Sequence, residues 1–519
     1  MAKPSSVVIV GGGHNGLIAA AYLARAGYKV TLLERLTVLG GAAVSALAFP
    51  GVEARLSRYS YLVSLLPKRI IKDLDLDIRF ARRRYSSYTP DPGGSNGLLV
   101  DNQDPVATRS SFRSIGAHSD ADAWTQFYQR TRRIAETVFP SLCEPLLSRD
   151  EQKRMLGDDT LWDQFIEQPL GEVIESSFSS DLVRGVVLTD GLIGTFTEAK
   201  AKNLAANRCF LYHVIGNGTG DWDVPIGGMG SVTSAMSTSA RKSGATLITG
   251  AEVTSVDPDG EVTYLHNETQ HSIRADYILA NVSSTELDRL IGVNHGLENE
   301  VNGAQAKVNL MLRRLPKLKD SSLDPAAAFG GTFHINELYS QLQSAYDQAA
   351  SGSIPNPVPA EIYCHSLADS SILSPELQAS GAQTLTVFAL HIPNHLVTES
   401  NNNQFRSQIE AAVLSSLDSV LGESIRDVIM TDENGDPCVE TKTTLDLEHA
   451  LRLPGGNIFQ QPLDWPFVED AEDLTSPAKK WGVETKWDRV LFCGSSAKRG
   501  GAVSGIGGQN AAMAILEAD

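Results

Sequence analysis

The sequence of 519 residues predicts an α/β fold in which a discontinuous domain with a parallel sheet carries an inserted α+β domain. Residues 7–16 and residues 490–505 support the sheet, because each block joins an apolar run to small residues, as a strand that enters a helix does. Residues 119–215 carry helical patterns instead, and residues 307–312 alternate like a strand of another sheet. These two stretches indicate the inserted domain.

The first block contains the motif Gly11-x-Gly13-x-x-Gly16, between the apolar residues 7–10 and the alanine-rich residues 17–26. The first glycine permits a tight turn, the second lets the backbone approach a pyrophosphate, and the third lets the helix pack on the strand. A diphosphate then lies at the helix N-terminus. We therefore expect a strand, a turn and a helix that bind a dinucleotide.

An acidic residue closes the second predicted strand. Glu34 follows the apolar residues 30–33, at the place where a carboxylate meets a ribose hydroxyl in dinucleotide-binding folds. Behind it, Gly40, Gly41 and Ala42 offer a second turn of small residues beside the nucleotide. This second turn suits a cofactor longer than NAD that lies extended through the domain.

Composition excludes several classes of function. The formal net charge of −18 disfavours a general affinity for nucleic acid or for anionic membranes. The five cysteines are scattered and form no Cys-x-x-Cys pair, so we expect neither a metal site nor a redox disulfide. Together with the lack of an apolar leader, they predict a cytoplasmic protein. We expect a small-molecule substrate; a homodimer and peripheral contact with a membrane stay open.

Turn-rich stretches divide the chain into five segments. We predict a nucleotide-binding domain made of residues 1–100, 222–300 and 446–519. Residues 101–221 and 301–445 form the predicted substrate domain, of which the first part is helical. The chain therefore enters and leaves the nucleotide-binding domain more than once.

Several motifs lie in a fixed order, in residues 13–17, 40–44, 56–62, 222–230, 453–459 and 493–510. By these motifs the chain resembles the phytoene desaturase-related FAD oxidoreductases of the flavin amine oxidase superfamily. Within them it is similar to the branch of pyridine nucleotide-disulfide oxidoreductase domain-containing proteins and carotenoid isomerase-like enzymes. The resemblance implies a Rossmann-like domain with tightly bound FAD, whose reactive ring reaches the boundary with the substrate domain.

The resemblance also implies which residues hold FAD. Glu34 would bind the ribose, the Val253 backbone would contact the adenine, and Gly494 and Val503 would lie along the ribityl chain and the pyrimidine edge. Backbone N–H groups at a helix start near Val503 would stabilise negative charge on the reduced flavin. The predicted cofactor-binding residues are Gly11, Gly13, His14, Asn15, Gly16, Glu34, Arg35, Gly40, Gly41, Ala42, Ser57, Val253, Gly494, Ala502 and Val503.

Lys307 is the residue predicted to lie nearest the reaction. In the resembled superfamily a lysine on a strand of this kind reaches flavin N5 through a water molecule, and residues 306–309 look like that strand. A partly buried lysine has a lowered pKa and relays a proton. The alternative is a solvated lysine at the start of a strand.

The chain departs from the family pattern at two places. Lys498 and Arg499 stand where relatives carry His-Pro, and Gln460 stands where a histidine often follows. We predict that Lys498 and Arg499 face the substrate as catalytic cations, which favours an anionic or polar molecule over a bare polyene. The alternative is that both side chains turn outward to solvent.

The C-terminal segment provides no aromatic residue for the pocket. Amine oxidases usually take one from this region, whereas residues 499–505 contain none, which disfavours a simple amine oxidase. We expect His213 to be a core or turn residue rather than a catalytic one. Candidates for an aromatic wall are Tyr59, Tyr61, Tyr212 and Trp222.

The leading hypothesis is an FAD-dependent oxidoreductase that desaturates a largely apolar or isoprenoid-like substrate by hydride transfer to flavin N5. The cofactor supplies the difficult chemistry, while the protein orients the substrate and excludes water. One alternative is a redox-neutral isomerase of a polyene or unsaturated lipid. Another is an FAD-bound interaction protein with a degenerate active site.

Overall fold

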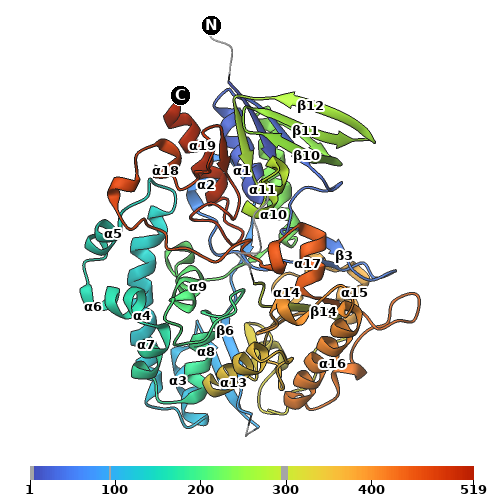
Figure 1. Cartoon of the computed structure of the whole chain (residues 1–519). Helices are drawn as coiled ribbons and strands as arrows, with labels where there is room; N and C mark the ends of the chain where they lie inside the picture. The colour runs from blue at the N-terminus through green and yellow to red at the C-terminus, as the bar shows by residue number, and fades with distance from the viewer. Residues whose placement is uncertain (1–4, 93–94, 294–301) are drawn as a thin grey trace.

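The computed structural model describes residues 5–92, 95–293 and 302–519. Three regions meet around one centre (Figure 1): the nucleotide-binding sheets and their helices at the top, a group of helices at the left, and a second large sheet with its covering helices at the right. The site described below lies where these regions meet.

The first sheet is parallel, and its order is β19 (Val490–Phe492), β13 (Tyr277–Ala280), β1 (Ser6–Val10), β2 (Lys29–Glu34) and β9 (Thr246–Thr249). Strand β1 is central, because Val8 lies opposite Thr31 of β2 and Ile278 of β13. The strands come from the beginning, the middle and the end of the chain. This arrangement confirms the predicted discontinuous Rossmann-like fold.

Three helices pack beside this sheet: α1 (His14–Arg25) lies between α10 (Met229–Lys242) and α19 (Ile506–Ala518). Helices α1 and α19 approach closely, because a Cβ added at Gly508 would lie 2.0 Å from the Asn15 carbonyl oxygen. Helix α19 begins at Ile506, later than the predicted start near Val503. Ala502 and Gly505 adopt φ values of 53° and 74°, in the left-handed region that a right-handed helix cannot include.

An antiparallel sheet of β10 (Ala251–Asp257), β11 (Glu261–His266) and β12 (Thr269–Arg274) stands beside the parallel one. Its buried residues Val253 and Val262 share an apolar cluster with Val8 and Ile278. This contact places the backbone of β10 at the edge of the nucleotide-binding region.

The predicted helical region is confirmed. It comprises α3 (Pro105–Ser114), α4 (Asp120–Ser141), α5 (Arg149–Leu156), α6 (Asp159–Trp162), α7 (Leu170–Ser177), α8 (Asp181–Thr189) and α9 (Ala205–Val214). Phe127, Phe165 and Phe210 pack at its centre, with ring centroids 5.5 to 6.0 Å apart. These helices form one wall of the cavity described below.

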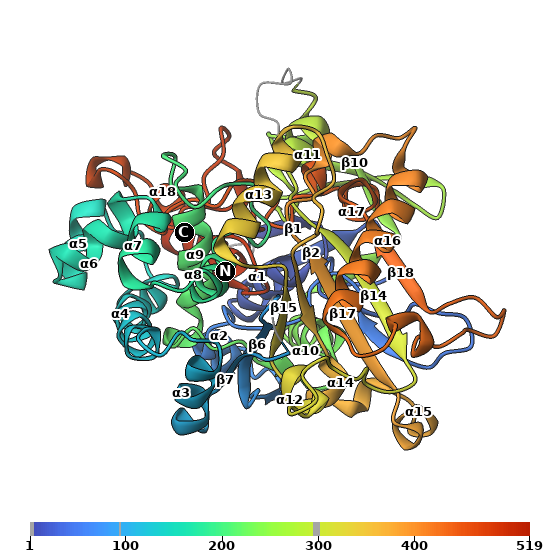
Figure 2. The same ribbon diagram turned by 90° about the horizontal axis from the view of Figure 1, so that it is seen from below.

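The largest sheet has the order β18 (Val439–Lys442), β14 (Ala306–Leu312), β17 (Gln383–Ala389), β16 (Ala360–Tyr363), β15 (Thr332–Ile335), β6 (Tyr85–Pro90) and β7 (Gly97–Asp101). On one face Val308, Val387 and Ile362 pack in an apolar core with residues of α16 (Asn402–Val420). Figure 2 shows α16 lying along this sheet. Because side chains alternate along each strand, the side chain of Lys307, which directly precedes Val308, points to the opposite face.

The remaining regular elements are short. They include β3 (Ser45–Leu47), β4 (Arg55–Ser57), α2 (Lys68–Asp73), β5 (Phe80–Ala81), β8 (Val224–Pro225), α11 (Ser284–Ile291), α12 (Pro325–Ala328), α13 (Tyr339–Ala350), α14 (His365–Ala368), α15 (Pro375–Ser380), α17 (Thr444–Leu451) and α18 (Pro477–Lys480). All five cysteines are buried and form no disulfide. Within the described ranges, no helix combines the length and the apolarity needed to cross a lipid bilayer.

Candidate active site

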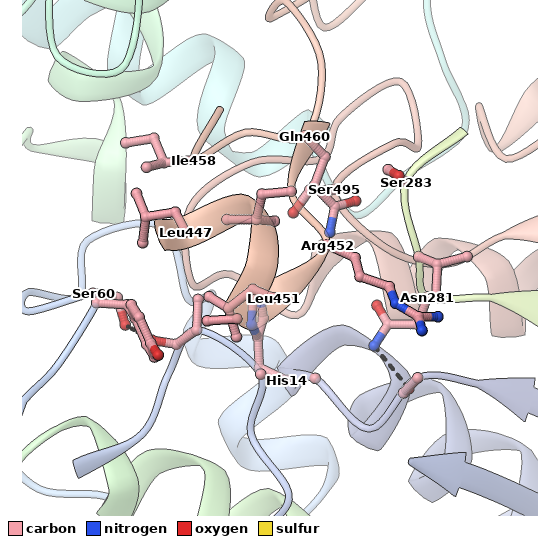
Figure 3. Close-up of a pocket in the computed structure, with 18 of the residues that line it drawn as sticks. His14, Ser60, Asn281, Ser283, Leu447, Leu451, Arg452, Ile458, Gln460 and Ser495 are labelled. Carbon is pink, nitrogen blue, oxygen red and sulfur yellow. Dashed lines mark hydrogen bonds between the residues drawn. The ribbon is translucent and has the colours of Figure 1, made fainter. Parts of the chain in front are cut away.

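One elongated pocket runs from the glycine-rich turn to the last segment before α19. Its walls come from the start of α1, the ends of β2 and β13, strand β10, helix α17, Lys307 of β14 and the segment that carries Val503. Figure 3 shows side chains from these distant segments pointing into a common space. The pocket therefore joins the parallel sheet to the largest sheet.

The glycines of the first turn make this end of the pocket. Gly11 adopts a φ of 101°, which side chains rarely tolerate, and a Cβ added at Gly16 would lie 2.5 Å from the Gly11 carbonyl oxygen. Gly11 and Gly13 line the pocket, whereas Gly16 packs beneath the turn. The turn thus leaves its backbone open to a diphosphate at the start of α1.

The Glu34 carboxylate lies in the pocket wall at the end of β2. Its Oε2 accepts a hydrogen bond of 2.6 Å from the Gly12 N–H, and its Oε1 accepts one of 2.8 Å from the Leu36 N–H. The side chain is held in one orientation by these two contacts. This is the arrangement expected of an acid that binds a ribose hydroxyl.

Beyond Glu34 the pocket is bounded by β10 and α17. Arg35 donates a hydrogen bond of 2.8 Å to the Ala450 carbonyl, which ties the end of β2 to α17. Arg452, just after α17, forms ion pairs with Glu252 and Glu286. Val253, Arg35 and Arg452 all line the pocket, so this end is the one that fits an adenosine.

Asn281 is a pocket residue that the sequence analysis did not identify. It follows β13, and its Nδ2 donates a hydrogen bond of 2.9 Å to the Gly11 carbonyl, drawn as a dashed line in Figure 3. A polar residue directly after a strand of a parallel sheet lies at the edge where such folds bind ligands. That signal was available for Asn281, as it was for Glu34.

Several buried polar groups of the pocket have no hydrogen-bond partner among the described residues. They are Nε2 of His14, Oδ1 of Asn15 and both amide atoms of Gln305. Burial lowers the pKa of His14 to about 4, so its ring is neutral at neutral pH. Unsatisfied buried polar groups are costly, and these groups fit a long cofactor that carries many hydrogen-bonding atoms. The residues present therefore fit FAD, and NAD alone would leave the far end unexplained.

Lys307 lies at that far end, where it is buried. Its Nζ donates hydrogen bonds of 2.8 Å to the Ser57 carbonyl and 2.9 Å to the Tyr59 carbonyl. Burial lowers its pKa to about 7, against a smaller opposing effect of the Glu440 carboxylate. The predicted position of Lys307 in the pocket wall agrees with the structure, and the solvated alternative is wrong.

A second cavity of about 720 Å³ opens from this end. It lies between the helical region and the face of the largest sheet that carries Lys307, and the residues that line both spaces are Tyr61, Leu62, Ile193, His213 and Trp222. His213 stacks on Trp222 with ring centroids 5.4 Å apart. Burial lowers its pKa to about 4, so it is a neutral wall residue.

The two predicted cations do not face the pocket. The buried Arg499 guanidinium donates hydrogen bonds to the carbonyls of Ser141, Glu144 and Trp481, and Lys498 pairs with Asp464. Both are therefore corrected from catalytic to structural residues. Carbonyls of two neighbouring segments accept from both terminal nitrogens of Arg499, whereas its buried Nε has no partner among the described residues.

The predicted cofactor-binding residues divide into those that line the pocket and those that lie behind its wall. Of the predicted cofactor-binding set, Ser57, Gly16, Gly40 and Gly494 do not line the pocket, and they support it from behind. Ser57 provides a carbonyl to Lys307, and its hydroxyl accepts a hydrogen bond from the Met229 N–H. Those that do line it are Gly11, Gly13, His14, Asn15, Glu34, Arg35, Gly41, Ala42, Val253, Ala502 and Val503.

Gln460 and the four aromatic candidates can likewise be sorted by whether they line the pocket. Gln460 does line the pocket, and so do three of the aromatic candidates, Tyr59, Tyr61 and Trp222. Tyr212 is buried outside it, and no described residue forms a hydrogen bond with its hydroxyl. The aromatic wall therefore comes from the segments around residues 59–61 and 222 and from β17, which contributes Phe388.

This fold and this pocket define a dinucleotide-dependent oxidoreductase with a long cofactor site. Residues 9–66 match the NAD(P)-binding Rossmann-like domain, and residues 69–332 match the flavin containing amine oxidoreductase family. The chain belongs to the flavin containing amine oxidoreductase family. It is an FAD-dependent oxidoreductase, as the sequence resemblance predicted.

The chain is also similar to three individual proteins. It is 51% identical to an uncharacterized protein of Mycobacterium tuberculosis, over 98% of this chain and 96% of that protein. It is 28% identical to the pyridine nucleotide-disulfide oxidoreductase domain-containing protein 2 of Mus musculus, over 99% and 94% of the two chains. A putrescine oxidase structure shares the fold, with a TM-score of 0.56, 15% identity and 99% of each chain covered.

Proposed function

We propose that this enzyme desaturates a carbon–carbon bond of a small organic substrate whose reacting segment is apolar. Bound FAD supplies a two-electron acceptor that takes a hydride. The substrate loses that hydride from one carbon and a proton from its neighbour, and a C=C bond forms between them. The electrons leave to an acceptor such as dioxygen or a quinone.

Lys307 is the observation that carries this proposal. Its amine is buried in the wall of the first pocket, 5.9 Å from the centre of the Tyr61 ring that lines both cavities, and two backbone carbonyls fix its position. A pKa of about 7 allows the amine to be neutral or charged near neutral pH. A group with a pKa close to the working pH is well suited to accept and release the proton that a desaturation sets free.

The walls of the junction support an apolar reacting segment. Leu62, Ile193 and Phe388 bring hydrocarbon surface to this point, and Tyr61 lies against Phe388 with ring centroids 4.3 Å apart. Such a wall excludes water from the reacting carbon atoms. No side chain of the segment 499–505 adds an aromatic ring there, which separates this pocket from that expected of a simple amine oxidase.

The test is anaerobic mixing of the FAD-loaded protein with isoprenoid hydrocarbons, long-chain alcohols and long-chain amines. The proposal predicts that one compound bleaches the flavin absorbance and yields a product lighter by two hydrogen atoms in the mass spectrum. A product of unchanged mass, formed with the oxidised flavin spectrum restored, would show an isomerase instead. An oxidised amine without a new C=C bond would also overturn the proposal.

A further inference from the structure

One row of side chains crosses the largest sheet from the cofactor pocket into the second cavity. Lys307 of β14 lies opposite Phe388 of β17, Phe388 lies opposite Glu361 of β16, and Glu361 lies opposite His334 of β15. Residues directly opposite on antiparallel strands share a face. Because neighbouring strands lie about 4.8 Å apart, the backbone at His334 is about 14 Å from that at Lys307.

The far end of this row is polar, although it is buried. His334 and Glu361 line the second cavity together with Asp190 from the end of α8 and Arg83 from the segment before β6. Behind them, the Glu337 carboxylate lies 2.6 Å from Nδ1 of His334 and accepts a hydrogen bond of 2.6 Å from the Thr189 hydroxyl. His334 is thus oriented by Glu337.

Two carboxyl groups at this end retain capacity to accept hydrogen bonds. Among the described residues, none donates a hydrogen bond to the Asp190 carboxylate, and Glu361 accepts one of 2.7 Å at Oε2 from the Tyr363 hydroxyl. Burial raises the pKa of Asp190 to about 6 and also raises the pKa of Glu361. Asp190 is half-buried and Glu361 is buried, and both line the second cavity, so a donor on a ligand there would meet acceptors that the described residues leave open.

The groups at this end favour a donor over an anion. Three carboxyl groups, those of Asp190, Glu337 and Glu361, lie here beside the Arg83 guanidinium and the His334 ring. Arg83 already donates to the Trp222 carbonyl and the Thr332 hydroxyl. A carboxylate head group would add a fourth acid, whereas an ammonium or hydroxyl group would meet open acceptors.

We propose that Asp190, Glu361 and His334 bind a hydrogen-bond-donating head group, a protonated amine or a hydroxyl, at the end of an elongated substrate. The apolar part of that substrate extends along Phe388 and Tyr61 toward Lys307. The position of its reacting carbon atoms rests on the function proposed above, but the head-group site does not. The sheet thereby sets the separation between head group and reaction, roughly two strand spacings or about 10 Å.

The experiment titrates the FAD-loaded protein with decylamine, 1-decanol, decanoate and decane while recording the flavin absorbance and fluorescence. We expect the amine and the alcohol to perturb the flavin at concentrations about tenfold lower than decane and decanoate, as a hydrogen bond to a buried carboxyl requires. Asp190→Asn and Glu361→Gln should each lower the preference for decylamine over decane about tenfold. Comparing amine with alcohol shows which donor the site prefers.

Glu136→Gln is the matched control, because Glu136 is an exposed acid on α4. It should retain the preference of the wild type. The proposal is overturned if decane or decanoate binds as well as the amine and alcohol, if none of the four binds, or if both cavity variants, folded and FAD-loaded, keep the wild-type preference. This binding readout needs no turnover, so it can be interpreted even if no desaturation is found. Likewise, failure of the binding test leaves the desaturation test interpretable.

Discussion

Lys307 and Phe388 lie opposite each other on β14 and β17, and the Lys307 Nζ is 5.0 Å from the centre of the Phe388 ring. The ring face favours the charged amine, yet burial outweighs this attraction and lowers the Lys307 pKa to about 7. In this environment the Lys307 amine gains or loses a proton near neutral pH.

This pKa makes stability depend on pH in a defined direction. The folded-state value of about 7 lies below the ordinary lysine value of 10.5, so the unfolded chain holds more protons between these limits. The contribution of Lys307 to the unfolding free energy therefore rises with pH through that window. We expect the unfolding free energy of the apoprotein, minus that of Lys307→Met, to increase from about pH 7 to about pH 10 in denaturant titrations. A difference that is flat or falls with pH would contradict the assignment.

Glu34 should determine how tightly FAD binds. Glu34→Gln weakens a charge-assisted hydrogen bond to the ribose worth about 1.5–3 kcal/mol, which corresponds to a rise of roughly 10-fold to 150-fold in the FAD dissociation constant. Isothermal titration of apoprotein with FAD measures this change. Equal FAD affinity in the wild type and the variant would show that Glu34 does not contact FAD.

Gln305 offers a test with two opposite effects. Gln305 lines the pocket, and both of its amide atoms are buried without a partner in the part of the chain that the structure describes. Gln305→Leu should stabilise the apoprotein by about 1 kcal/mol or more and weaken FAD binding, because the amide is satisfied only by the cofactor. Gln152→Leu is the control, since Gln152 is equally buried and unpartnered but lies outside the pocket. Gln152→Leu should stabilise the protein and leave its FAD affinity unchanged. If Gln305→Leu bound FAD as tightly as the wild type, a contact between Gln305 and FAD would be excluded.

Arg499 should be important for stability and not for chemistry. Arg499→Met leaves three backbone carbonyls without their donor, and we expect a loss of at least about 2 kcal/mol in unfolding free energy. Lys498→Met removes a partly exposed ion pair, worth at most about 1 kcal/mol. Both folded variants should bind FAD normally. A stable Arg499→Met protein that has lost its flavin reactivity would restore the catalytic assignment.

Local patterns predicted many of the residues that line the pocket beside the glycine-rich turn. The turn at Gly11 and the acid at Glu34 are recognisable because their function depends on residues close together in the sequence. The direction of Arg499 was not predictable, because its three acceptors come from two other segments. A pair of adjacent cations in a glycine-rich segment looks the same whether it faces a ligand or the protein interior.

The second cavity was not predicted at all. His334 and Glu361 join the row of side chains that contains Lys307 only through the pairing of β14, β17, β16 and β15, and no spacing in the sequence encodes that order. The sequence favoured a largely apolar substrate, whereas the cavity carries a polar end. The polar end of the cavity arises from the register of the sheet, which is a property of the folded chain.

The pH dependence of the midpoint potential of bound FAD tests the central claim most directly, because it requires neither the substrate nor the natural electron acceptor. If Lys307 exchanges a proton beside the flavin, the potential of the wild type should change slope near pH 7, and Lys307→Met should lack that change. Superimposable curves for wild type and variant, both loaded with FAD, would contradict the account.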